Sequence, residues 1–280
     1  MKIYFSTKFK IFLAKIIFSI LKILSIKIKR LSKRGGINYH LDLSEGIDLS
    51  IFLLGSFEKK ISLSIIKNLE ISKNKTLFSI IDIGSNIGDK SLFLANEFYK
   101  KNYKFKIYSI EPTDYALKKQ IKNLKVNSHL INHVDINQCI IQSDINNNVK
   151  QLFSSWRLDT KSEHPKLMGQ KNIVGQNSLK ISLDDFCKSK NIINLKAIKI
   201  DVDGYEFDVI KSGVNILKKY KPAIFVEYSE YLMQEIDKNF SKEGFITLVS
   251  KLGYKVFSLS NELINLYKVK PNTTLNLILK

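Results

Sequence analysis

Two acidic residues of this chain stand at positions where an α/β protein could use them to hold a cofactor. The first is Asp82, which is followed by Gly84, Asn86 and Gly88 in the pattern D-x-G-x-N-x-G. Glycines in such a turn let the backbone take positive φ values and come close to a bound ligand. The second is Glu111, which ends an apolar run about one helix and one strand after the turn. An acid at that distance is where an open α/β sheet holds ribose hydroxyls.

The spacing of the glycines argues against a dinucleotide site. A pyrophosphate site has the pattern G-x-G-x-x-G, whereas Asp82 would place a carboxylate where the diphosphate should lie. A carboxylate suits a ligand that carries positive charge beside a ribose, such as S-adenosylmethionine. The residues expected to bind this cofactor are Asp82, Gly84, Ser85, Asn86, Gly88, Glu111 and Pro112. A tight turn without a ligand remains the alternative, because the motif alone is a weak signal.

Further acids follow two more expected strands, which end near Ile200 and Val226. These acids are Asp201, Asp203, Glu206 and Glu227. Because the carboxyl ends of parallel strands meet at one crevice, we expect the acids of all four strands to converge there. A positioned carboxylate could take the proton of an acceptor hydroxyl, and Asp201 is the first candidate for this base. The other three acids and His164 are alternative bases, and Asp201 could instead only cap the following helix. Clustered carboxylates permit a metal ion, but no spacing demands one, and we expect no metal requirement.

The elements that must carry these residues read as alternating strands and helices, which is typical of an α/β sheet. The segment before them, residues 35–56, is expected to form short strands and a turn, followed by a helix over 57–69. Two closing strands have no long helix between them and are therefore expected to be antiparallel. The expected strands are residues 80–83, 107–110, 130–141 (one or two strands), 197–200, 222–228, 254–259 and 274–279.

A segment that is poor in apolar runs, residues 144–180, interrupts this alternation. It holds the chain's single tryptophan, Trp156, together with Arg157 and His164. A loop of this length inside a compact domain is usually functional or disordered. We expect a lid that touches the acceptor substrate. The alternative is a surface excursion that the tryptophan anchors.

The N-terminal residues 4–31 are rich in Phe, Ile and Leu, but lysines interrupt them throughout. Their longest run without charge, residues 16–21, falls far short of the ~20 residues needed to span a bilayer. Lysines recur at positions 8, 15, 22 and 29, which leaves a wide apolar face on a helix. We therefore expect residues 1–34 to form a basic amphipathic helix in an anionic membrane interface. The alternative is a helix packed on the domain or on a second subunit. A cleaved signal peptide fits less well, because no A-x-A-like site follows.

The composition of the chain fits one large domain, expected over residues 35–280, with the helix as an appendage. The net charge of +19 is weak evidence for a nucleic-acid partner, because about half of it belongs to residues 1–34. Cys139 and Cys187 have no C-x-x-C partner and are expected to be buried in a reducing compartment. We expect a cytoplasmic protein, which the N-terminal helix could attach to the inner face of the cell membrane.

Taken together, these residues resemble the FkbM-type family of S-adenosylmethionine-dependent methyltransferases. The resemblance runs from about Asn38 to the C-terminus and is carried by residues 82–88, 111–112, 182–186, 199–206 and 222–227. It implies a class I methyltransferase fold, a three-layer sandwich around a seven-stranded, mostly parallel sheet whose last strand is antiparallel. It also implies O-methylation of a hydroxyl on a sugar, a glycan or another small molecule. Two departures are Ser85, where the family usually has alanine, and Asp203, where it usually has glutamate.

Two rival functions are a nucleic-acid methyltransferase and a membrane-associated scaffold with a degenerate pocket. Methylation of base amino groups typically uses an N-P-P-Y-like motif, and residues 200–203 do not match it. A scaffold would not need both Asp82 and Glu111. We therefore expect an active enzyme whose acceptor belongs to polysaccharide or similar biosynthesis. Cofactor binding would separate enzyme from scaffold, and methyl transfer to glycans or to RNA would separate the two enzymes.

Overall fold

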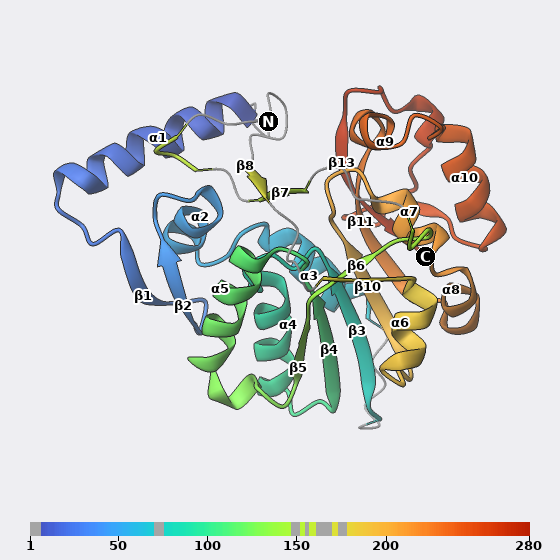
Figure 1. Cartoon of the computed structure of the whole chain (residues 1–280), viewed down its shortest axis with the longest axis horizontal. Coiled ribbons are helices and arrows are strands. Elements are labelled where there is room, and N and C mark those ends of the chain that lie inside the picture. The colour runs from blue at the N-terminus through green and yellow to red at the C-terminus, as the bar shows by residue number, and fades with distance from the viewer. Residues whose placement is uncertain (1–6, 70–75, 147–151, 155–156, 161–169, 173–177) are drawn as a thin grey trace.

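A seven-stranded sheet forms the centre of the computed structural model, which describes residues 7–69, 76–146, 152–154, 157–160, 170–172 and 178–280. Its strands lie in the order β12 (Val256–Ser258), β13 (Thr274–Leu279), β11 (Ala223–Ser229), β10 (Leu195–Ile200), β3 (Phe78–Ile83), β4 (Phe105–Ile110) and β5 (Val134–Asn137) (Figure 1). Neighbouring strands are parallel except that β13 is antiparallel to both of its neighbours. The order and the single reversed strand confirm the expected class I methyltransferase fold.

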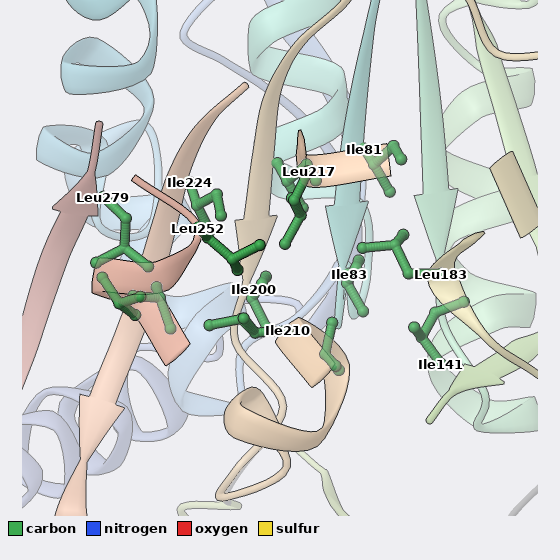
Figure 2. Packing of buried hydrophobic residues seen from close by; sticks show 14 of the residues in the cluster. Ile81, Ile83, Ile141, Leu183, Ile200, Ile210, Leu217, Ile224, Leu252 and Leu279 are labelled. Carbon is green, nitrogen blue, oxygen red and sulfur yellow. The ribbon is translucent and has the colours of Figure 1, made fainter. Parts of the chain in front are cut away.

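Helices cover both faces of this sheet, and its central strands are therefore buried on both sides. Along β3 the side chains alternate, so that Ile80 joins one apolar cluster and Ile81 the other. The cluster with Ile81 packs against one set of helices, as Figure 2 shows for Leu183, Ile210, Leu217 and Leu252. Those helices are α6 (Leu183–Ser189), α7 (Glu206–Lys211), α8 (Val214–Tyr220) and α10 (Lys242–Lys251). The cluster with Ile80 packs against the helices on the other face of the sheet, α3 (Lys59–Asn68), α4 (Asp89–Lys100) and α5 (Asp114–Lys125).

The N-terminal residues fold differently from the single long helix predicted over residues 1–34. Helix α1 spans only Thr7–Ile23, and Lys29–Arg34 form strand β1, which pairs with β2 (Ile37–Asp42). The hairpin turn uses Gly35 and Gly36, both with positive φ. The longer helix was predicted because lysines recur every seven residues, but this spacing continues from α1 into strand β1 and therefore does not mark the end of the helix. The backbone N–H groups of the β2 residues Asn38 and His40 donate to side chains of α5 and of the turn that follows it.

The run from Asp48 to Gly55, predicted as a strand, is the helix α2 (Gly46–Leu54). Asp48 lies in the first turn, where a negative charge favours the helix dipole. Gly55 ends the helix in the left-handed conformation, and its N–H donates to the carbonyl of Ile51. Both signals are present in the sequence, but a short apolar run does not separate strand from helix.

The remaining elements are short. Within residues 144–180, hereafter the insert, β7 (Leu152–Ser154) pairs with β8 (Gln170–Asn172) in antiparallel fashion. At the two ends of the insert, β6 (Cys139–Ile141) pairs in parallel with β9 (Leu179–Ile181). Helix α9 spans Glu230–Ile236, and two 3₁₀ turns span Ser128–Leu130 and Leu266–Lys268. Among the described residues, no helix has both the length and the apolar character that crossing a membrane requires.

Candidate active site

A cavity of about 600 Å³ lies at the carboxyl ends of β3, β4, β10 and β11. Pockets for small molecules typically enclose about 300–1,000 Å³, so this one can hold a cofactor-sized ligand. Its lining includes residues from all four strand ends, among them Gly84, Ser85, Asn86, Glu111, Pro112, Asp201, Asp203 and Glu227. The structure therefore brings these predicted site residues together at one crevice. Asp82, Gly88 and Glu206 do not line the cavity.

The glycine turn after β3 is shaped by its neighbours in the sheet. Gly84 has a φ of +75°, and a Cβ atom there would lie 1.9 Å from the carbonyl oxygen of Asp201. The backbone N–H groups of Gly84 and Ser85 both donate to the carbonyl of Ile110. Gly88 has a φ of +84° and packs against Gln120, outside the cavity lining. The first glycine is thus required because the turn lies directly against the end of β10, and the second because α4 begins there.

Glu111 lies at the cavity wall with most of its acceptor capacity already used. Its Oε2 accepts from the N–H of Asn86 at 2.9 Å, which joins the ends of β3 and β4. Its Oε1 accepts from the N–H and the hydroxyl of Thr113 at 2.9 and 2.6 Å. A carboxylate has roughly four acceptor positions, so about one remains for a ligand hydroxyl. Burial raises the pKa of Glu111, against the hydrogen bonds from Thr113 and Asn86, which lower it.

Asp82 supports the cavity floor and does not line the cavity, so its direct contact with the cofactor stays a prediction. Its side chain is 1% exposed, accepts from the Ser91 hydroxyl at 2.7 Å and forms an ion pair with Lys199 at 3.4 Å. Lys199 also donates to the carbonyl of Gly84 at 2.9 Å and forms an ion pair with Asp201 at 3.2 Å. This one ammonium group therefore fixes the ends of β3 and β10 relative to each other.

The prediction from sequence missed Lys199, which lines the cavity floor. The signal was the period of two along β10, since Lys199 and Asp201 stand on the same side of the strand. It also missed Glu58, which lies in the turn before α3 with a φ of +47° and lines the cavity. Burial raises the pKa of Glu58, and the charge of Lys90 opposes this shift.

Three carboxyl groups of the described cavity lining have no direct partner: those of Glu58, Asp203 and Glu227. None of them makes a hydrogen bond or an ion pair with any residue that the structure describes, whereas Asp201 is paired with Lys199. Burial raises the pKa of Asp203 to about 8, and the charges of Asp201 and Glu206 add to this effect. Burial, and then the charge of Asp201, raise the pKa of Glu227 well above its usual value. Asp203 has a φ of +51°, within the turn that follows β10.

Glu206 shapes that turn. Its carboxylate accepts from the backbone N–H groups of Val202 at 2.9 Å and of Gly204 at 3.0 Å, and its side chain is buried. Glu206 therefore positions the turn that carries Asp203, and its predicted role as an alternative base stays a prediction. His164, the remaining candidate base, lies outside the described residues, as does Trp156. Among the residues that are described, no three His, Cys, Asp or Glu side chains are placed to hold a metal ion.

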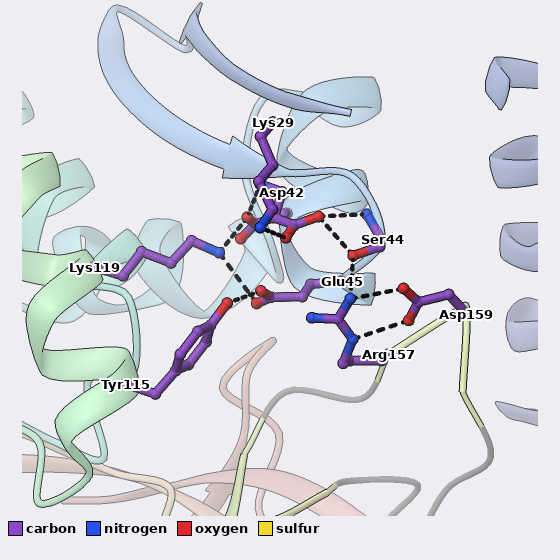
Figure 3. A network of polar contacts seen from close by, with 9 residues as sticks. Lys29, Asp42, Ser44, Glu45, Tyr115, Lys119, Arg157 and Asp159 are labelled. Atoms are coloured by element: carbon purple, nitrogen blue, oxygen red, sulfur yellow. Dashed lines mark hydrogen bonds and ion pairs between the residues drawn. The ribbon is translucent and has the colours of Figure 1, made fainter. Parts of the chain in front are cut away.

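Part of the insert is clasped to the corner between β2 and α2 (Figure 3). Arg157 forms an ion pair with Asp159 at 2.7 Å and donates to the hydroxyl of Ser44 at 3.0 Å. The backbone N–H of Leu158 donates to the carbonyl of Ser44 at 2.7 Å. On the other side of this corner, Glu45 and Asp48 are buried and form ion pairs with Lys119 of α5. The insert reaches the cavity through Leu152, which is one of the lining residues.

A family model described as the methyltransferase FkbM domain matches residues 82–256. Similar solved structures include a methyltransferase FkbM from Methylobacillus flagellatus KT, with 15% identity, a TM-score of 0.40 and coverage of 76% of this chain and 46% of that chain. They also include a METTL16 MTase domain (12% identity, TM-score 0.48, 99% and 83% covered) and P. horikoshii TYW2 in complex with MeSAdo (16%, 0.44, 98% and 84%). The chain spans about half the length of the first of these structures. The comparison with curated proteins gave no match. Because the family model covers more than half of the sequence, the chain belongs to the FkbM methyltransferase domain family.

Proposed function

We propose that the chain is an S-adenosylmethionine-dependent methyltransferase that acts on a hydroxyl group of a sugar, a glycan or another small polar acceptor. The observation that carries this proposal is the presence of unpartnered carboxyl groups in the described part of the cavity, above all Asp203 and Glu227 at the ends of β10 and β11, with Glu58 as a third. A carboxyl group that is half-buried and has no protein partner costs stability. It becomes useful when a ligand supplies the missing hydrogen-bond donors, and acceptor hydroxyls are such donors.

Asp203 is the best-suited base for the hydroxyl proton. A general base works best when its pKa lies near the working pH, and burial brings the pKa of Asp203 to about 8. Asp201, the first candidate from the sequence, forms an ion pair with Lys199 instead, so its carboxylate is already engaged by a protein partner. We therefore assign Asp201 and Lys199 to positioning the turn, and Glu227 to orienting the acceptor.

The residues present fit S-adenosylmethionine, which supplies an electrophilic methyl group on a positively charged sulfur. Glu111 would hold a ribose hydroxyl with its one remaining acceptor position, and the turn at Gly84 to Asn86 would contact the rest of the nucleoside end. Among the described residues, six acids and two lysines line the cavity, so the lining attracts a cationic ligand: Glu58, Asp89, Glu111, Asp201, Asp203, Glu227, Lys90 and Lys199. Asp89 and Asp201 form ion pairs with these lysines, and the structure describes no ion pair for the other four acids.

This excess of acid also favours a neutral, hydroxyl-bearing acceptor over a nucleic acid. Nucleic-acid affinity comes largely from lysine and arginine side chains that neutralise phosphates. Here both lysines of the described cavity lining are engaged: Lys90 with Asp89 and the Phe57 carbonyl, and Lys199 with Asp201, Asp82 and the Gly84 carbonyl.

The proposal is tested by methyl transfer from isotopically labelled S-adenosylmethionine to panels of glycans, small polyhydroxylated acceptors and RNA. We expect label in the hydroxyl-bearing panels, as alkali-stable methyl ethers, and none in RNA. Label confined to RNA would support the rival enzyme. Cofactor binding without transfer to any panel, including extracts of polysaccharide precursors, would support the scaffold.

Because several acids of the cavity have no ion-pair partner, we expect the affinity for the positively charged cofactor to depend on pH. A positive sulfur lowers the pKa of nearby carboxyl groups, so its binding releases protons and strengthens as pH rises toward 8. S-Adenosylhomocysteine has the same ribose and amino acid but a neutral sulfur. The ratio of its Kd to that of S-adenosylmethionine should therefore rise at least about fivefold between about pH 6.5 and 8.5. Calorimetry of both ligands measures this, and a pH-independent ratio would contradict charge recognition by these acids.

A further inference from the structure

Helix α1 carries two apolar faces, of which only one is packed on the part of the protein that the structure describes. Phe18 is buried in the same apolar cluster as Ile80, and Ala14, Ile17 and Leu21 pack against that cluster. Ile11, on the same side of the helix, is also buried. The opposite face is exposed and contains Phe12, Ile16, Ile20 and Ile23, which recur at spacings of three and four residues. In Figure 1, α1 lies along the outside of the molecule above α2. The packed face explains how the helix is held, and the exposed face has no covering element among the described residues.

Exposed basic side chains border this second face. Lys15 and Lys22 of α1 are exposed and lie one heptad apart, on the side of the helix between its two apolar faces. The chain that follows adds the exposed Lys27, Lys29 and Lys33. From residue 7 to residue 34 the sequence contains no acid at all. The hydrogen bond from Arg157 lowers the pKa of Asp159 and the nearby charge of Lys22 adds to this effect, but the Asp159 carboxylate is already paired with Arg157. An apolar helix face bordered by lysines is complementary to a surface that is anionic outside and apolar beneath.

We propose that the exposed face of α1 docks on an anionic membrane surface, with the helix lying in the plane of the interface. In this arrangement Phe12, Ile16, Ile20 and Ile23 enter the boundary between headgroups and acyl chains, while Lys15 and Lys22 contact anionic headgroups. Over its described residues α1 has 17 residues, fewer than the ~20 that crossing a bilayer requires, which fits a helix lying in the interface.

The charges favour lipid over a second copy of the chain as the occupant. In a two-fold dimer the same patch lies on both sides of the interface. Two copies of α1 would therefore bring their lysines together, and α1 itself has no acid to neutralise them. Anionic headgroups supply the missing charge, and each basic residue near such a surface contributes about a fivefold gain in binding, from about 1 kcal/mol.

The test is co-sedimentation of the full chain with vesicles of mixed phosphatidylglycerol and phosphatidylcholine, and with vesicles of phosphatidylcholine alone. We expect binding to the mixed vesicles that weakens when salt is raised from about 0.1 M to 1 M. The double variant F12S/I16S should bind at least about tenfold more weakly. Its matched control is L263S/L63S, since Leu263 and Leu63 are 69% and 49% exposed and Phe12 and Ile16 are 59% and 40% exposed.

A second pair of variants tests the charge. K15Q/K22Q should weaken binding to the mixed vesicles about tenfold or more, whereas K218Q/K219Q removes the same charge from α8 and should leave it unchanged. Brominated acyl chains should quench the tryptophan fluorescence of an I16W variant more strongly than that of the wild type. Equal binding of F12S/I16S and L263S/L63S, with all variants folded by circular dichroism, would overturn the proposal. So would a wild-type dimer that ignores vesicles and that F12S/I16S converts to a monomer.

Discussion

Asp203→Asn should lower turnover at least about a hundredfold, the lower end of what a positioned general base contributes. The substitution keeps the size of the side chain and removes its basicity. Because the wild-type carboxyl group is active only when ionised, the wild-type rate should rise with pH toward the pKa of about 8. The positive charge of the bound cofactor moves this rise to lower pH. The variant should lose the rise, and both effects are measured by initial rates across the pH range.

Two measurements separate this role from a structural one. At about pH 6.5 the wild-type carboxyl group is largely protonated, so the asparagine side chain of the variant mimics it and cofactor affinity should change less than about twofold. The comparison variant is Asp201→Asn, which breaks the ion pair with Lys199 and should weaken cofactor binding while retaining the pH-dependent rise. A full rate in Asp203→Asn, with the rise lost in Asp201→Asn, would return the role of base to Asp201.

Glu111→Gln should weaken the binding of S-adenosylmethionine about 10- to 100-fold. Hydrogen bonds to a charged group are worth roughly 1.5–3 kcal/mol, and each 1.4 kcal/mol is about a factor of ten. The amide also turns an NH₂ group toward the N–H donors of Asn86 or Thr113, which now lack an acceptor. Calorimetry should find the same loss for S-adenosylhomocysteine, because both ligands carry the ribose.

The control for this variant is Thr113→Val, which removes one hydrogen bond to the same carboxylate without changing its charge. We expect it to change affinity by less than about fivefold. Unaltered affinity in Glu111→Gln would show that the ribose is held elsewhere. A loss for S-adenosylmethionine alone would show that Glu111 recognises the sulfur charge instead.

The convergence of acids at one crevice could be predicted because it depends on local signals and one topological rule. An apolar run that ends in an acid predicts a strand end, and parallel strands bring such ends to the same edge. Glu111 and Asp201 directly follow β4 and β10, as this pattern predicts, whereas Glu227 lies within the last residues of β11 and Asp82 lies inside β3. The reversed pairing of β12 and β13 was predictable for a similar reason, since too few residues separate them for a crossover helix.

The role of individual acids could not be predicted, because it depends on contacts distant in sequence. Asp82 is drawn beneath the cavity by Ser91 and by Lys199, which lies far along the chain. From the sequence alone, a lysine in a strand is expected to be exposed to solvent, because the acidic partners that allow its burial are not known. Glu58 reaches the cavity only through the packing of the turn before α3. Strand β1 could not be recognised from the sequence, because its lysines and arginines continue the spacing of the basic residues in the preceding helix.

The β1–β2 hairpin has a consequence for aggregation. Both edges of β2 are occupied: β1 pairs with one, and on the other Asn127 accepts from Asn38 at 2.9 Å and Asn123 from His40 at 2.8 Å. Unpaired strand edges recruit other chains, and Ile37, Tyr39 and Leu41 would make this edge strongly apolar. Cleavage after Arg34 would remove β1 and open a β-addition site, whereas cleavage just after α1 would not. We therefore expect a shortened protein to keep the edge of β2 covered only if it begins before Lys29.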